Sequence, residues 1–219
     1  MTDFEIIKSR HSVRSFLDKE IESEKIKRLE EEISSINEES GLHFQLFSNE
    51  PEAFMANKSH YGEFKNCRNY FALVGPKNAD SAIGYYGERL VLFAQELGLN
   101  TCWVALTYRK SHVNINTDRG EKFYVVIALG YGETQGTAHK SKAASEVSNC
   151  SADTPDWFAS GIDAVLMAPT AMNQQKYYLK YVDGRVEAKE KPAMYSKLDL
   201  GIVKYHFEVG SGKNSSVWL

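Results

Sequence analysis

The feature that most constrains this chain is an apolar helical pattern that stops at a proline and leads into a polar turn. Phe158, Ile162 and Val165 recur at helical spacing, and Thr154-Pro155-Asp156 before them offers a hydroxyl at the N-cap and a proline at the first helical position. Pro169 disfavours helical geometry at the residue before it and cannot donate a backbone hydrogen bond. The stretch therefore predicts a helix that ends there and continues directly into a turn.

The turn from Pro169 to Gln175 carries one hydroxyl and three carboxamides, which belong to Thr170, Asn173, Gln174 and Gln175. A carboxamide offers both a donor and an acceptor, so such a turn suits a flat, uncharged ligand such as a flavin ring or a sugar alcohol. A capped turn with polar surface residues is the alternative interpretation of the same pattern.

A second segment, near the start of the chain, concentrates positive charge. Arg10, His11, Ser12 and Arg14 place two guanidinium groups, an imidazole and a hydroxyl within five residues. Guanidinium groups match pairs of phosphate oxygens, and a serine can add a neutral hydrogen bond. A solvated basic loop neutralised by nearby carboxylates is the alternative.

Together the two segments resemble the nitroreductase family of FMN-dependent oxidoreductases. That family begins with an Arg-Arg/His-Ser-x-Arg-x-Phe/Tyr segment and carries a Pro-Ser/Thr-x-x-Asn-x-Gln turn, and residues 10–16 and 169–175 match these patterns. In the common form of the family the turn follows one helix after the basic segment, whereas here it lies near the other end of the chain. This order is similar to the TM-type nitroreductases, in which a single chain imitates the two-chain dimer of its relatives.

The resemblance implies an α+β, nitroreductase-like fold, with a central mixed or antiparallel sheet flanked by helices and two pseudo-repeat halves. The stretch after residue 142 is rich in Ala, Ser and Asn, so we place the halves at 1–142 and 143–219. A monomeric pseudo-dimer is the expected state, and a homodimer with sites between chains stays open.

Hydrophobic periodicity and turn residues predict the other elements. Thr2 and Glu5 form a capping-box pattern for a short first helix. Gly98 and Gly210 are expected to stop two later helices, and Gly84 to allow close packing. Further helices are expected over 26–36, 84–97 and 197–209, strands over 42–46, 70–74 and 123–129, and a hairpin at Asp183-Gly184.

The resemblance also assigns residues to an FMN site. Relatives carry a basic pair after the strand that corresponds to 123–129, and Lys140 and Lys142 stand there; solvated linker lysines are the alternative. Gly98 to Val104 resembles the segment before the loop that offers a backbone N–H to the flavin N5, so Ala105 and Leu106 are the backbone candidates. The cofactor-binding set implied is Arg10, His11, Ser12, Arg14, Lys140, Lys142, Pro169, Thr170, Asn173 and Gln175.

The activity that the resemblance implies is a ping-pong hydride transfer from NADH or NADPH through FMN to a nitroaromatic, quinone or flavin acceptor. Ordinary side chains cannot carry out hydride chemistry, so a flavin has to supply it. The sequence contains no Ser-His-Asp or HExxH pattern, and its six histidines are dispersed, so we expect no metal. A non-enzymatic flavin-binding or sensing protein and a flavin-free degenerate scaffold stay open as alternatives.

Composition excludes several classes of partner. The net charge of −3 gives no general surface for nucleic acids, and no apolar run approaches the ~20 residues of a membrane helix. Three cysteines without Cys-x-x-Cys spacing argue against a disulfide framework or a zinc site. A reducing cytoplasm and a small-molecule electron acceptor fit these bounds best.

Overall fold

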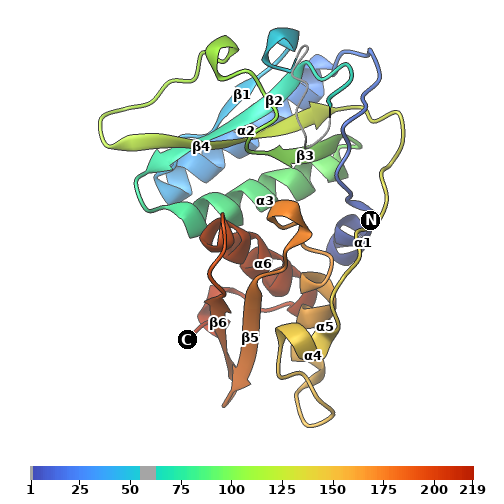
Figure 1. Cartoon of the computed structure of the whole chain (residues 1–219), viewed down its shortest axis with the longest axis vertical. Helices are drawn as coiled ribbons and strands as arrows, with labels where there is room; N and C mark the ends of the chain where they lie inside the picture. Colours follow the sequence, from blue (N-terminus) through green and yellow to red (C-terminus); the bar gives the residue numbers. More distant parts are fainter. Residues whose placement is uncertain (1, 55–62) are drawn as a thin grey trace. The chain divides into compact units, whose positions relative to one another are not determined.

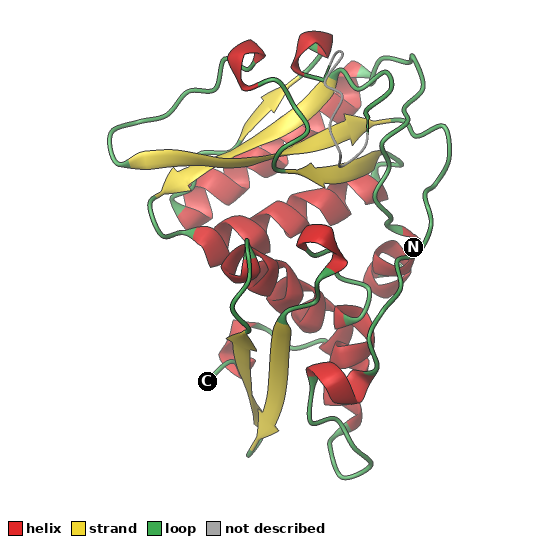
Figure 2. Ribbon diagram, in the orientation of Figure 1, coloured by secondary structure: helices red, strands yellow, loops and turns green. Residues whose placement is uncertain are grey.

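The computed structural model describes residues 2–54 and 63–219 of the chain, and its elements are labelled in Figure 1. The helices are α1 Asp3–Ser9, α2 Ser23–Ser40, α3 Asp80–Glu96, α4 Ala144–Val147, α5 Asp156–Val165 and α6 Ser196–Ser211. The strands are β1 Gln45–Phe47, β2 Asn69–Pro76, β3 Asn100–Val104, β4 Glu121–Gly130, β5 Tyr177–Val182 and β6 Arg185–Glu190. Short 3-10 turns lie at η1 Pro51–Ala53, η2 Lys110–His112, η3 Ala171–Asn173 and η4 Ser215–Val217. Helices and antiparallel strands share the chain (Figure 2), which confirms the α+β class.

One compact unit, formed by Arg10–Ala79 and Leu90–Thr137, is built on a sheet with the order β1-β2-β4-β3. All neighbouring strands in it run antiparallel. β2 is buried from Asn69 to Gly75, and Phe71 pairs with Ile127 of β4. Continuous apolar runs belong to strands covered on both faces, so β2 and β4 lie at the centre of the sheet.

The other compact unit comprises Met1–Ser9, Asp80–Arg89 and Ala138–Leu219. Its helices approach one another closely because glycines face backbone. A Cβ atom at Gly84 of α3 would lie 1.9 Å from the Leu198 carbonyl oxygen of α6, and one at Gly201 of α6 would lie 1.9 Å from the Ser81 carbonyl oxygen. The expectation of close packing at Gly84 is therefore confirmed.

Several local predictions are confirmed by the hydrogen bonds and dihedral angles. The Thr2 N–H donates to Glu5 Oε2 at 2.7 Å and the Glu5 N–H to Thr2 Oγ1 at 3.3 Å, which closes the capping box. Asp183 and Gly184 join β5 to β6 with φ values of 46° and 83°, as a two-residue hairpin turn requires. Gly98 follows α3 with a φ of 76°.

Several sequence-based boundaries were wrong: the strand expected over 42–46 is Gln45–Phe47, and the helix expected over 84–97 begins at Asp80. Thr154 does not cap α5, because its hydroxyl bonds to the backbone of Ser151 instead. Gly210 does not end α6, which continues to Ser211 and stops at Gly212 in the left-handed conformation. A Cβ atom at Gly210 would lie 2.3 Å from Ala164 Cβ, so this glycine is required by packing against α5 rather than by a helix end.

The two compact units have other residue ranges than the two halves expected from the sequence. Compactness and internal duplication are different properties, so the division into 1–142 and 143–219 stays a prediction.

Cys67, Cys102 and Cys150 are free thiols. Within the described residues, no helix has both the length and the apolar character needed to cross a membrane.

Candidate functional site

The basic segment lies alongside β3 in the sheet unit. Ser12 forms a parallel bridge with Thr101, and the Val13 N–H donates to the Thr101 carbonyl at 3.0 Å. Arg10 and Val13 are buried in this extended stretch, while Ser12 and Arg14 are exposed. No hydrogen bond or ion pair joins the Arg14 guanidinium to another described residue, so the segment presents a cation beside a hydroxyl.

A loop after β4 holds the basic segment from its other side. The His11 Nδ1 donates to the Gln135 carbonyl at 3.1 Å, and a Cβ atom at Gly136 would lie 2.8 Å from His11 Cβ. Asn100 anchors this loop: its Oδ1 accepts from the Gly132 N–H at 2.9 Å, and its Nδ2 donates to Gln135 Oε1 at 3.0 Å. Asn100 was not predicted from the sequence, where its one distinguishing feature is that it is a polar residue at the start of an apolar strand.

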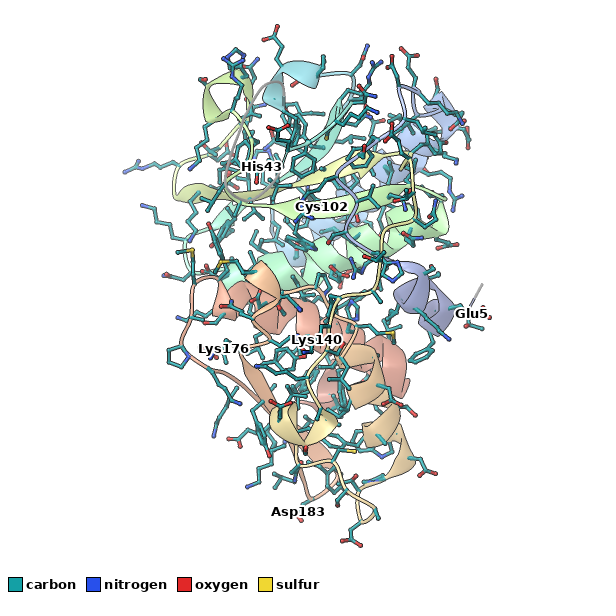
Figure 3. All side chains as sticks on the ribbon, turned by 45° about the vertical axis from the view of Figure 1, so that its right-hand side comes forward. Glu5, His43, Cys102, Lys140, Lys176 and Asp183 are labelled. Carbon is teal, nitrogen blue, oxygen red and sulfur yellow. The ribbon has the colours of Figure 1, made fainter. Side chains whose placement is uncertain are left out.

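Cys102 of β3, labelled in Figure 3, lies close to three residues of the basic segment. Burial raises the pKa of its thiol above the ordinary value, and Arg14, Ser12 and Arg10 act against that shift. All three residues therefore lie near one thiol. The backbone candidates Ala105 and Leu106 follow directly after the same strand, and the Leu106 side chain is 51% exposed.

The carboxamide turn, in the other unit, has an unusual backbone. α5 ends before Pro169 as expected, and η3 follows it. Met172, Asn173 and Gln175 adopt φ values of 51°, 52° and 47°, in the left-handed region. Left-handed geometry costs roughly 1–2 kcal/mol for each such residue, and strain of this kind gathers at functional sites.

Gln175 is buried at the base of the turn, and the protein itself uses its carboxamide. Its Nε2 donates to the Lys140 carbonyl and to Asn173 Oδ1, both at 3.0 Å. Its Oε1 accepts from the Lys142 N–H at 2.9 Å. A carboxamide has few further positions to offer, so Gln175 ties residues 140–142 to the turn.

Lys140 and Lys142 differ in what their side chains contact. The Lys142 Nζ donates to the carbonyls of Gln174 and Gln175, at 3.1 and 2.9 Å, and so neutralises the exposed edge of the turn. The Lys140 side chain, labelled in Figure 3, is exposed. Its carbonyl accepts from Asn173 Nδ2 at 2.9 Å. Phosphate contacts by these lysines stay a prediction.

Asp199 of α6 accepts two hydrogen bonds from the turn, and it was not among the residues predicted from the sequence. Its Oδ1 accepts from the Ala171 N–H at 3.0 Å and its Oδ2 from Gln174 Nε2 at 2.8 Å. The side chain is only 2% exposed, and burial raises its pKa to about 6 although both hydrogen bonds lower it. Nothing in the local sequence around Asp199 marks it, because its partners are distant in the chain.

The structure thus gathers the candidates into two groups, each within one unit. Arg10, His11, Ser12 and Arg14 lie along β3 with Ala105 and Leu106 just beyond it, while Lys140, Lys142, Thr170, Asn173 and Gln175 surround the turn after Pro169. The donors that remain fit a flavin nucleotide. A guanidinium and a hydroxyl suit a phosphate, and the Thr170 O–H and the second Asn173 N–H suit a polyol or ring edge.

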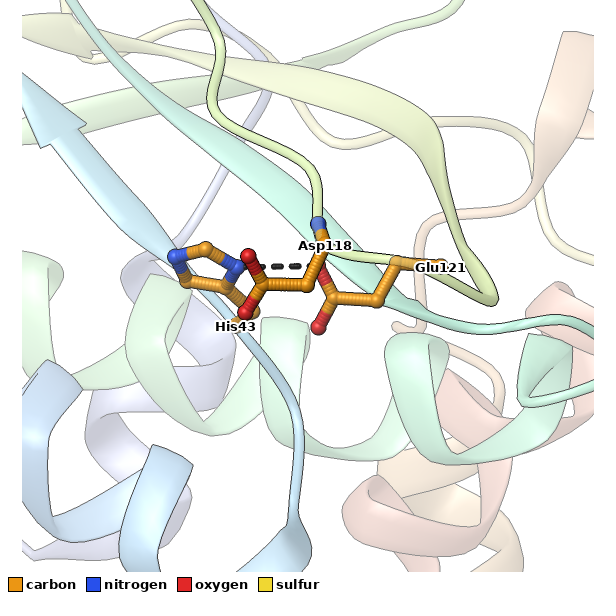
Figure 4. A group of neighbouring side chains, drawn as sticks. All are labelled: His43, Asp118 and Glu121. Atoms are coloured by element: carbon orange, nitrogen blue, oxygen red, sulfur yellow. Dashed lines mark hydrogen bonds and ion pairs between the residues drawn. The ribbon is translucent and has the colours of Figure 1, made fainter.

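A separate group of His43, Asp118 and Glu121 places three potential metal ligands close together (Figure 4). Its internal bonds account for its arrangement: Glu121 Oε2 accepts from the Asp118 N–H at 2.7 Å and from His43 Nδ1 at 3.0 Å. We therefore assign it a structural role, in which it fixes the turn before β4 to the segment that leads into β1.

Comparison with known proteins identifies the family and the fold. A family model described as "Putative TM nitroreductase" matches residues 3–211. The crystal structure of a putative nitroreductase from Thermotoga maritima is similar over 96% of this chain and 83% of its own, with a TM-score of 0.70 and 21% identity. A putative NADH dehydrogenase/NAD(P)H nitroreductase from Bacteroides thetaiotaomicron has a TM-score of 0.52 at 17% identity, covering 66% of this chain and 95% of its own. Its counterpart from Parabacteroides distasonis has a TM-score of 0.51 at 20% identity, with the same coverage. No curated protein matches the sequence.

Proposed function

The chain belongs to the family described as putative TM nitroreductases, and from this premise we propose that it is an FMN-dependent oxidoreductase. We propose NADH or NADPH as the reductant and a nitroaromatic, quinone or flavin as the acceptor. The observation that carries the proposal is the strained turn at 172–175, because backbone strain of this kind gathers at active sites and ligand-binding sites.

The proposed roles follow from which donors remain available. Arg14 and Ser12, exposed beside β3, would bind the FMN phosphate, and buried Arg10 would support them electrostatically. Thr170 and Asn173 would donate to the ribityl chain or to the ring edge.

Gln175 and Lys142 take a different role in this proposal from direct contact with the cofactor. Their polar atoms bond to the backbone of the turn and of residues 140–142, so they hold Asn173 in its left-handed conformation. Orientation of this kind matters because a displaced donor contributes little to binding.

When bound, FMN supplies the hydride chemistry between nicotinamide and acceptor, in two half-reactions that share one site. The protein's part is to bind and orient. Ala105 and Leu106, directly after β3, are the proposed backbone donors to the flavin N5. The names of the Bacteroides and Parabacteroides proteins support nicotinamide as the reductant.

Stopped-flow spectroscopy tests the proposal. The protein reconstituted with FMN should lose its flavin absorbance on mixing with NADH or NADPH, and should regain it when a quinone or nitroarene is added. The Arg14→Ala variant should retain less FMN, whereas Arg109→Ala, another exposed arginine of the same unit, should behave as the wild type. Failure to take up FMN would indicate a flavin-free scaffold, and uptake without reduction would indicate a flavin-binding protein that is not a reductase.

A further inference from the structure

The turn at 171–174 is held by a buried carboxylate that carries a net electrostatic cost. Asp199 lies in the first turn of α6 and is 2% exposed. Within the described part of the chain, burial and the two hydrogen bonds from the turn are the causes that act on its pKa, and no lysine or arginine is among them. A buried carboxylate without a cation partner is expensive, so an apolar or neutral residue would serve packing alone better.

The groups that contact Asp199 show which role, other than packing, the carboxylate has. The Ala171 N–H and the Gln174 carboxamide point to it from the turn, and the same Gln174 Nε2 also donates to the Met194 carbonyl at 2.7 Å. Tyr177 of β5 is the titratable neighbour. Burial raises the pKa of its phenol and Asp199 raises it further, so Tyr177 stays neutral. Among the described residues, the groups that lower the pKa of Asp199 are the two donors of the turn.

The two bonds enclose the strained residues. Ala171 precedes Met172 and Asn173, and Gln174 follows them, so Asp199 bonds to both sides of the left-handed pair. An ionised carboxylate accepts such bonds about twice as strongly as a neutral group. We propose that Asp199 is a positioning residue for the flavin site: its ionised carboxylate holds the 171–174 turn in the conformation that presents Asn173 to the ligand.

This inference rests on the proposed function for its ligand, but its first test does not need one. In the protein without added flavin, hydrogen exchange measured by NMR should show the Ala171 amide less protected in Asp199→Asn than in the wild type. Asp163→Asn is the matched control, because Asp163 is an exposed residue of α5 in the same unit. Equal protection of Ala171 in all three proteins would overturn the inference.

The second test measures flavin affinity by fluorescence between about pH 5 and about pH 8, which brackets the Asp199 pKa of about 6. Riboflavin is measured beside FMN, because the FMN phosphate itself titrates near pH 6 and riboflavin has no phosphate. Wild-type affinity for riboflavin should fall as the pH drops through about 6. Asp199→Asn should bind about tenfold more weakly at the upper pH, as expected for loss of charge-assisted bonds, and without that pH dependence.

The outcomes separate the two proposals. Wild-type protein that binds neither flavin would defeat the proposed function, while amide exchange would still decide what Asp199 does to the turn. Flavin binding that is the same in Asp199→Asn and the wild type at every pH would defeat the positioning role and leave the proposed function standing. If Asp199→Asn does not fold, the wild-type riboflavin titration decides, since a flat profile would contradict the inference.

Discussion

Asp199→Asn should stabilise the protein near neutral pH, even though it removes a residue that organises the candidate site. The carboxylate has an ordinary pKa of 3.8 and a pKa of about 6 in the folded protein, because burial disfavours its charge. The folded protein therefore binds an extra proton between these two values. Its free energy of unfolding must fall as the pH rises through that window.

The magnitude follows from the shift. Each pKa unit corresponds to about 1.4 kcal/mol, so a shift from 3.8 to about 6 makes the ionised carboxylate cost about 3 kcal/mol of stability above pH 6. The residue is 2% exposed, so screening by solvent removes little of this cost. Asparagine resembles the protonated acid in shape and charge, so the variant should not incur this cost of burying a charge.

The assay is urea denaturation of wild type, Asp199→Asn and the control Asp163→Asn at about pH 4 and about pH 7. The stability of Asp199→Asn relative to wild type should increase by about 2.5 kcal/mol between the two pH values, because part of the cost is already present at pH 4, while Asp163→Asn shows no such change. If the difference in unfolding free energy between Asp199→Asn and wild type stays constant with pH or changes in the opposite direction, the raised pKa of a buried, unpaired Asp199 is refuted. A variant that is more stable yet binds flavin more weakly would be the signature of a group kept for function.

Three other substitutions probe the remaining features. Arg14→Ala should weaken FMN binding by about 1.5–3 kcal/mol with little change in stability, because the side chain is exposed; equal affinity by equilibrium titration would contradict the phosphate role. Asn173→Ala should weaken FMN binding and also lose roughly 1 kcal/mol of stability in a thermal melt, since alanine tolerates a φ of 52° poorly, whereas Asn173→Gly should lose binding alone. Gly84→Ala should cost about 1–3 kcal/mol in urea denaturation, because its Cβ would meet the Leu198 carbonyl at 1.9 Å, and a neutral result would argue against this helix contact.

Much of the fold could be predicted because its signals are local. The α5 periodicity and Pro169 lie within a few residues of the helix end they define, and the Asp183-Gly184 pair carries the φ preferences of its own hairpin turn. The apolar runs in β2 and β4 require burial on both faces wherever they are placed. The resemblance that led to the family depends on two short segments of the same local kind.

Tertiary structure decided which polar groups are used inside the protein and which remain for a ligand. Gln175 and Asn173 are both carboxamides of one turn, yet Gln175 is buried and bonded throughout while Asn173 is exposed. The sequence predicted that Gly210 ends α6, but contact with Ala164 requires this glycine for packing and the helix ends at Gly212.

Asp199 shows the physical reason most clearly. Its partners, Ala171 and Gln174, lie more than twenty residues earlier in the chain, and its raised pKa comes from the solvent that folding removes. Desolvation and the choice of hydrogen-bond partner depend on every element packed around a group. Sequence alone determined the helices, strands and motif-bearing segments, and the packed structure alone determined which carboxylate would hold the turn.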